Sequence, residues 1–225
     1  RLPRAFAVGS RAVAGRRVAS RPIAETIKLP DTIIRQVDLN LKTTQNGLTW
    51  SELEEHLSDY SRQEWIDIDN ISDEGFATLS KILKIPELHF KSKIVDEIYP
   101  HIDYVQCASF IFIQSGKIQY PENANNYLTI SKSGIIVVCN GTKIITVSRH
   151  SVDLFNKVLN SIKSDQKDEI FVVPTLYSIL EQTLNDYKSL LSEIELEIIK
   201  IGKTPKSKLP RDFLERIYQL DKEVT

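Results

Sequence analysis

The chain has 225 residues, enough for one large domain or two small ones. Its hydrophobic content of 41% and charged content of 26% are those of a soluble globular protein. A formal net charge of -1 excludes a chain that is basic throughout, so we expect no nucleic-acid partner. Cys107 and Cys139 both lie among apolar residues, which predicts buried free thiols rather than a disulfide.

Residues 1–24 differ in composition from the rest of the chain. They contain many arginines and no acidic residue, a composition typical of a mitochondrial transit peptide. A basic arm on anionic lipid or nucleic acid, or a flexible terminus without a role, fits equally well. We therefore treat 1–24 as a separate basic segment. Its arginines are Arg1, Arg4, Arg11, Arg16, Arg17 and Arg21.

The next elements are predicted from periodicity and capping signals. A partial period of two predicts strand character within 27–42, and Asn46-Gly47 predicts a turn. Thr49, with Glu52 three residues later, predicts a capping box that opens a helix over 50–57. A short strand follows over 65–68, then a helix capped by Asn70 or Ser72, then a helix that begins at Pro86 and ends before Pro100.

A meander of strands is predicted after Pro100. The hairpin signal Asn140-Gly141 is the strongest in the chain, and turns are also expected at Ser115-Gly116 and Gly134. An amphipathic helix is expected over 152–162. The expected strands cover 101–114, 127–131, 135–139 and 143–148. They predict an α/β (α+β) fold with a mixed, partly antiparallel sheet.

A long helix of about 28 residues is predicted from Pro174 to Gly202, because apolar residues recur there at close to a heptad spacing. A last helix begins near Arg211 and runs to Thr225 without a stop signal, and the chain contains no Met. Both features suggest part of a longer or processed protein. The apolar seam of the long helix comprises Leu176, Leu180, Thr183, Tyr187, Leu191, Ile194, Ile198 and Ile201.

Motifs for catalysis are weak. Asp67 and Asp69 form a D-x-D pattern after a strand, which suits a divalent cation in a metal-dependent transferase, or else a solvated strand face beside a helix cap. No two histidines have metal-ligand spacing, and the chain lacks a nucleophile elbow, a dinucleotide fingerprint and a P-loop. We therefore do not predict an enzyme. Acids at 96, 97, 103, 181 and 186 would suit Mg²⁺ if the long helix packs against 86–100, and otherwise form ordinary solvated helix surface.

Four segments together resemble the cytosolic domain of the CorA family of magnesium and divalent-metal channels. They are EWIDIDNISDEGFATLSKILKIPELHF (64–90), KIVDEIYPHIDYVQCASFIFI (93–113), LTISKSGIIVVCNGTKIITVSRH (128–150) and PTLYSILEQTLNDYKSLLSEIELEIIKI (174–201). The resemblance implies an αβα sandwich with a long C-terminal helical arm. It also implies a pentameric homo-oligomer, and a stalk helix from near Arg211 into membrane segments that this chain does not contain.

Divalent ions between protomers are implied to sense cytosolic concentration. Lys91 and Ser92 stand where the family often has an acidic pair, and Lys cannot coordinate Mg²⁺, so that site is expected to be missing. Glu97, Glu181 and Asp186 remain as candidate ligands for Mg²⁺ or another divalent cation. The implied location is the cytoplasmic side of the cell membrane, with the mitochondrial inner membrane as the alternative.

The expected organisation is a basic segment at 1–24, an αβα domain at 25–165, and a helical hairpin with the start of the stalk at 166–225. The first functional hypothesis is the regulatory and assembly domain of a CorA-like Mg²⁺ channel or transporter. The second is a stand-alone interaction protein that pairs through its heptad helix. The third is a metal-dependent transferase that uses Asp67 and Asp69.

Overall fold

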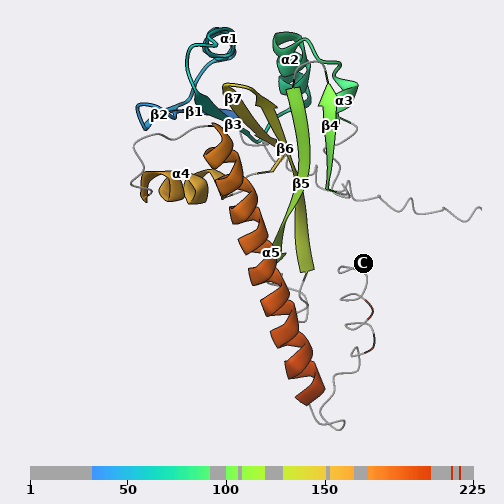
Figure 1. The fold of residues 1–225 in the computed structure, drawn as a ribbon. Helices are drawn as coiled ribbons and strands as arrows, with labels where there is room; N and C mark the ends of the chain where they lie inside the picture. The colour runs from blue at the N-terminus through green and yellow to red at the C-terminus, as the bar shows by residue number, and fades with distance from the viewer. Residues whose placement is uncertain are drawn as a thin grey trace, which may run out of the picture.

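The computed structural model describes residues 32–91, 100–105, 108–119, 129–150, 153–164 and 172–203, together with residues 214 and 218. These residues form seven strands and five helices (Figure 1). The strands are β1 (Ile33–Asp38), β2 (Thr43–Asn46), β3 (Glu64–Asp69), β4 (His101–Val105), β5 (Ala108–Gln119), β6 (Thr129–Asn140) and β7 (Lys143–Ser148). The helices are α1 (Trp50–Ser58), α2 (Asp73–Leu83), α3 (Leu88–Lys91), α4 (Leu154–Ser164) and α5 (Val172–Lys203).

The strands form one mixed sheet in the order β2-β1-β3-β7-β6-β5-β4. β3 and β7 are parallel, with Ile66 opposite Ile145, whereas the other neighbouring pairs are antiparallel. β3 therefore lies in the middle of the sheet, between β1 and β7, and every residue of the strand is buried.

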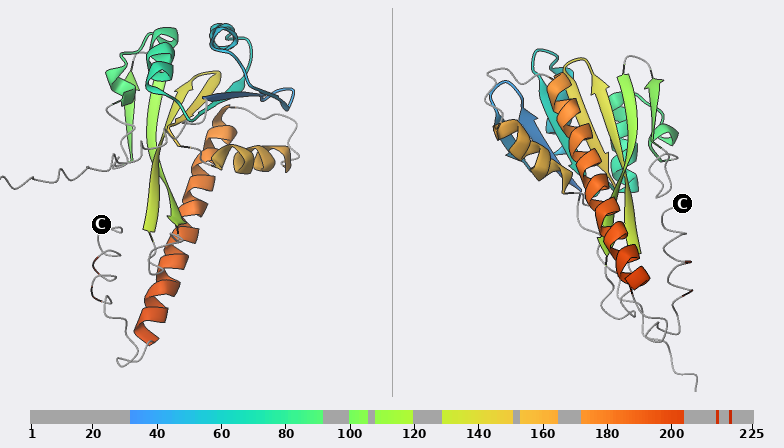
Figure 2. Two further views of the ribbon diagram at one scale, coloured as in Figure 1. Left: turned by 180° about the vertical axis from the view of Figure 1, so that it is seen from behind. Right: turned by 60° about the horizontal axis from the view of Figure 1, so that its bottom comes forward.

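Helices cover the sheet on both faces, so the predicted αβα sandwich is confirmed (Figure 2). On one face, Phe76 of α2 and Phe90 of α3 join Ile66 and Phe110 in an apolar core. On the other face, Phe155 of α4 and Ile179 of α5 pack with Trp65, Val137 and Ile144. Side chains alternate between faces along a strand, which is why Trp65 and Ile66 belong to opposite cores.

Local signals placed several elements correctly. Glu52 N–H donates to the Thr49 hydroxyl and Thr49 N–H donates to the Glu52 carboxylate, so the predicted capping box is present. Ser72, one of the two predicted residues, caps α2. Gly47 and Gly141 have φ of 73° and 52°, the left-handed conformation that the two predicted Asn-Gly turns require.

Three predictions in the meander were wrong. The strand predicted over 101–114 is two antiparallel strands, β4 and β5. Ser115 and Gly116 lie inside β5 rather than in a turn, and Gly134 lies inside β6 opposite Gln114. At Gly116 a Cβ would lie 3.0 Å from Cδ2 of Leu190, so this glycine allows α5 to approach the strand closely. The tertiary contact, not a turn, explains the glycine.

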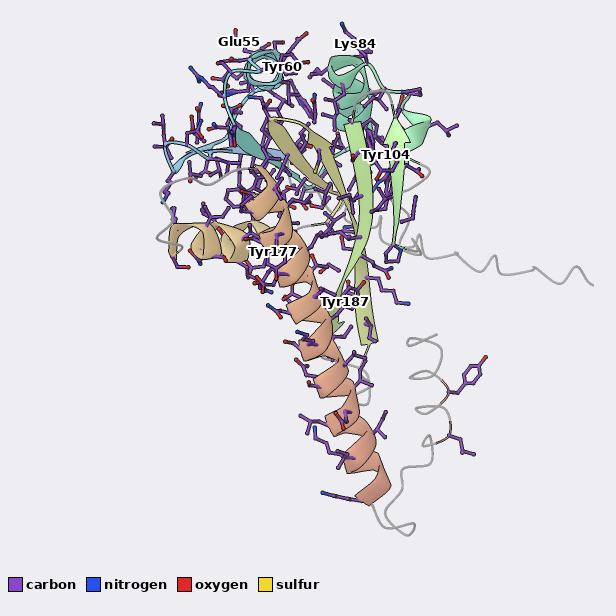
Figure 3. All side chains as sticks on the ribbon, in the orientation of Figure 1. Glu55, Tyr60, Lys84, Tyr104, Tyr177 and Tyr187 are labelled. Carbon is purple, nitrogen blue, oxygen red and sulfur yellow. The ribbon has the colours of Figure 1, made fainter. Side chains whose placement is uncertain are left out.

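The long predicted helix is confirmed as α5, which has 32 residues and continues past the end of the sheet (Figure 1). Its predicted seam is divided between two environments. Thr183 and Ile194 are buried, whereas Leu191 and Ile198 are exposed. Tyr187 lies on the side of α5 toward β5, and Tyr104 lies on the edge strand β4 (Figure 3).

Several predictions fall outside the described residues, namely those on the 1–24 segment, on Cys107 and on the helix near Arg211. Cys139 is a half-buried free thiol, and burial raises its pKa to about 11, as expected for an unreactive cysteine. The division of the chain at 24 and 165 stays a prediction.

Candidate functional site

A polar cleft of about 890 Å³ opens where α4 and α5 meet the end of the sheet. Its wall combines four carboxylates with three lysine or arginine side chains and several hydroxyls. The acids are Asp69, Asp153, Asp186 and Glu193, and the bases are Arg35, Lys117 and Lys157, with His150 beside them. Asp186, one of the predicted site residues, lines this cleft.

A buried charge cluster adjoins this cleft, and two of its members, Arg35 and Asp69, line the wall. Arg35 of β1 donates from Nη1 to Asp67 Oδ2 at 3.1 Å and from Nη2 to Asp69 Oδ2 at 2.9 Å. On the other side of β3, Thr146 donates to Asp67 Oδ1 at 2.6 Å and Ser148 donates to Asp69 Oδ1 at 3.1 Å. The register explains this arrangement, since Arg35 and Thr146 are both directly opposite Asp67.

The expectation of a solvated face for Asp67 and Asp69 was wrong, because both residues are buried. β3 is a central strand covered on both faces, so its period of two does not give a solvent-facing side. Burial raises the pKa of Asp67 to about 6, against the opposing effects of the Thr146 hydrogen bond and the Arg35 charge. All four carboxylate oxygens accept protein hydrogen bonds, which disfavours the metal-dependent transferase.

Of the three predicted metal ligands, the structure describes Glu181 and Asp186, and it does not bring these two together. Glu97 lies outside the described residues. Glu181 is exposed on α5 and does not line the cleft, whereas Asp186 does. Five helical residues correspond to a rotation of about 140°, so Glu181 and Asp186 point in different directions.

Asp186 instead joins α5 to α4. Lys157 Nζ lies 2.7 Å from Asp186 Oδ1, and Gln182 donates to the same oxygen at 3.3 Å. Across the described residues, no group of three or more His, Cys, Asp or Glu side chains has an arrangement that would hold a metal ion. The described residues of this chain therefore do not offer a divalent cation a complete ligand set.

Sequence reasoning missed Arg35, Lys157 and Asp153. Arg35 gave one weak signal, a charged residue within an otherwise apolar strand pattern at 33–37. Its partners are more than 30 residues away, so the pairing depends on strand register that the pattern does not contain. Lys157 and Asp153 look like ordinary helix-surface charges until α4 packs against α5.

The fold defines a class of protein: an αβα domain with a long helix that projects beyond its sheet, and with no catalytic constellation in the described residues. A family model described as CorA-like Mg²⁺ transporter protein matches residues 61–225. The chain belongs to this family. A search of curated proteins gives no match.

Solved structures share the fold at low sequence identity. The soluble domain of CorA from Methanocaldococcus jannaschii matches with a TM-score of 0.59 and 17% identity, covering 85% of this chain and 71% of that one. The complete CorA magnesium transporter from the same organism matches with a TM-score of 0.62 and 16% identity, covering 85% of this chain and 56% of that one. The ZntB cytoplasmic domain from Vibrio parahaemolyticus matches with a TM-score of 0.56 and 11% identity, covering 83% of this chain and 71% of that one. This chain thus spans little more than half of the complete transporter. Searching the described residues for a helix long and apolar enough to cross a bilayer finds none.

Proposed function

We propose that this chain is the cytosolic regulatory and assembly domain of a CorA-like divalent cation transporter, with no catalytic step of its own. The family match over residues 61–225 carries the proposal. Agreement with the fold of a CorA soluble domain supports it. The proposed location is the cytoplasmic side of the cell membrane, and the comparisons lend no support to the mitochondrial alternative.

The projecting helix α5 supports a role in assembly. Tyr177, Leu184, Leu191 and Ile198 are seven residues apart along it, and each is more than half exposed. An apolar stripe with this period is the pattern by which helices pair. We propose that the stripe is covered by helices in a homo-oligomer, with a pentamer as the expected state of the whole protein and a monomer as an acceptable state of this chain alone.

Mg²⁺ is the cargo we propose, after the description of the family. Regulation by bound Mg²⁺ needs a site of its own, and Glu181 and Asp186 do not form one together within a single chain. We propose that any regulatory Mg²⁺ lies between protomers, where an acid of one chain meets ligands of the next. Lys91 stands in place of a carboxylate that the family often has, so we expect binding in the millimolar range or weaker.

Transport is tested with the complete gene that encodes this chain. Purified protein in vesicles that contain a Mg²⁺-sensitive dye should give Mg²⁺ influx down its gradient, and Zn²⁺ and Co²⁺ should be compared in parallel. Empty vesicles control for leakage. Absence of flux for every divalent cation tested would refute the transporter assignment, whereas flux of another cation would correct only the cargo.

Sensing and assembly are tested separately. Calorimetric titration of the complete, assembled protein with MgCl₂ should give weak heat that Asp186→Asn or Glu181→Gln reduces. Exposed Glu55→Gln on α1 is the matched control. Light scattering of the complete protein should give five copies. Tight Mg²⁺ binding that neither variant alters would place the sensing site elsewhere.

A stand-alone interaction protein is the second candidate, and the same exposed stripe on α5 favours it. The two functional hypotheses predict different sequences for the complete gene. Two apolar segments of about 20 residues beyond Thr225 support the transporter. A gene without them, whose product pairs through α5 in solution, supports the interaction protein.

A further inference from the structure

A second and smaller pocket lies beside the cleft, between α4 and the edge of the sheet that β2 forms. Its volume of about 420 Å³ is in the range of small-molecule sites. The described residues of its wall include no acidic side chain, whereas four carboxylates line the cleft. The wall combines Arg35 of β1, Thr44 and Asn46 of β2 and Lys163 of α4 with the apolar side chains of Phe155 and Leu159.

The strand register explains why polar groups line this pocket. Arg35 and Asn46 are directly opposite each other, and Thr44 lies two residues from Asn46 along β2. Because side chains alternate between faces along a strand, all three lie on one face of the sheet. The Arg35 guanidinium lies 4.8 Å from the centre of the Phe155 ring, so this is the face that α4 covers. The space over β2 is therefore bordered by short polar side chains instead of core residues.

Several of these polar groups are hydrogen-bond donors with capacity left. Arg35 donates once from Nη1 and once from Nη2 to the aspartates of β3, so other N–H groups of its guanidinium remain available. The buried Thr44 hydroxyl has no hydrogen-bond partner in the described part of the chain. An unsatisfied hydroxyl is costly, so rotation of the Thr44 side chain toward an acceptor in the pocket is favourable. Asn46 adds an amide N–H donor, whereas Asn156, also on the wall, already donates to Asp153 at 3.3 Å.

Lys163 supplies the positive charge by which the pocket favours an anion. It is exposed in the last turn of α4, and it makes no ion pair within the described residues. Arg35 contributes less, because Asp67 and Asp69 already share its charge. These carboxylates and the last carbonyls of α4 oppose a negative ligand. We therefore expect a modest affinity, with a dissociation constant in the millimolar range.

We propose that this pocket binds a small phosphate-type anion, held by Lys163, Asn46 and Thr44 with Arg35 beside them. Inorganic phosphate and the phosphoryl group of a small metabolite share this chemistry. A nucleotide is disfavoured, because Phe155, the aromatic residue of the described wall, is only 3% exposed and offers no ring face to a base. The bound anion bridges β2 and α4. The inference rests on contacts within this chain, so it stands whether or not the complete protein transports Mg²⁺.

Calorimetric titration of the complete protein, in a detergent without phosphate groups and at fixed ionic strength, tests the proposal with sodium phosphate and with glycerol 3-phosphate. Asn46→Asp places a carboxylate opposite Arg35 and should weaken binding at least about ten-fold, since like charges repel. Gln45→Glu is the matched control, because it adds the same charge to β2 on the opposite face and should change affinity less than about two-fold. Lys163→Gln should weaken binding several-fold.

Hydrogen exchange locates the bound anion. Phosphate should raise amide protection in 43–46 and 154–164 several-fold in the wild-type protein and in Gln45→Glu, but not in Asn46→Asp. Saturable binding of either ligand with this pattern supports the proposal, and the tighter ligand identifies the source of the phosphoryl group. The absence of saturable heat with both ligands overturns it. So does equal weakening by Asn46→Asp and Gln45→Glu, or protection that rises only in other parts of the chain.

Discussion

A buried ion pair between β3 and β7 offers the sharpest test of how this sheet is stabilised. Lys143 Nζ lies 2.6 Å from Glu64 Oε2, and the two side chains are 1% and 0% exposed. Glu64 also accepts from Gln36 Nε2 at 3.0 Å and lies 2.9 Å from His56 Nδ1. The carboxylate is therefore held from three elements and is fully removed from water.

Lys143→Met should destabilise the chain strongly, because it leaves the Glu64 charge buried without its cation. Removal of one partner of a buried pair costs about 3–5 kcal/mol. The hydrogen bonds from Gln36 and His56 remain, so we expect the lower end, about 3 kcal/mol. For a chain of this size, that loss lowers Tm by roughly 6–12 °C. Urea unfolding followed by circular dichroism measures the free energy.

A double variant separates charge burial from lost packing. Glu64→Gln combined with Lys143→Met removes both charges and keeps a group that bonds to Gln36, so more than half of the lost stability should return. Lys200→Met, in an exposed pair with Glu197, is the control and should change stability by less than about 0.5 kcal/mol. A loss below about 1 kcal/mol for Lys143→Met, or no recovery in the double variant, would contradict this reasoning.

The remaining predictions concern a close contact, a cap and a pH dependence. Gly75→Ala places a Cβ 2.8 Å from Ile71 Cγ1, so it should lower the stability measured in thermal melts by about 1–3 kcal/mol. Gly202 has open space around it, so the control Gly202→Ala should be neutral or stabilising. Equal effects of the two substitutions would refute the packing argument. Thr49→Ala removes the cap of α1 and should cost about 1 kcal/mol in urea unfolding, and no loss would mean that the capping box is dispensable. Burial raises the pKa of Asp67 from 3.8 to about 6, so the folded chain binds this proton more tightly than the unfolded chain. Stability should fall by about 3 kcal/mol as pH rises from about 4 to above 6, and Asp67→Asn should remove this slope; a slope of the opposite sign in the difference between the two chains would refute the assignment.

Local signals in the sequence were sufficient for elements whose cause is local. The capping box of Thr49 and Glu52 and the two Asn-Gly turns depend on residues within four positions of each other. The length of α5 followed from its apolar period. The strand boundaries in 101–140 could not be predicted from local signals. Gly116 and Gly134 look like turn residues in the sequence, but both lie inside strands, where Gly116 allows close packing of α5 and Gly134 pairs with Gln114.

The sequence by itself determined the fold class, the family and the long helix, since these depend on periodicity, on local capping and on the order of motifs along the chain. Only the tertiary structure decided which charged side chains are buried and which partners they pair with. Arg35, Asp67 and Thr146 meet because β1 and β7 flank β3 in a particular register. Lys157 meets Asp186 because α4 packs on α5. A charge in the sequence looks the same whether it will be solvated or buried, and burial is set by neighbours that are distant along the chain.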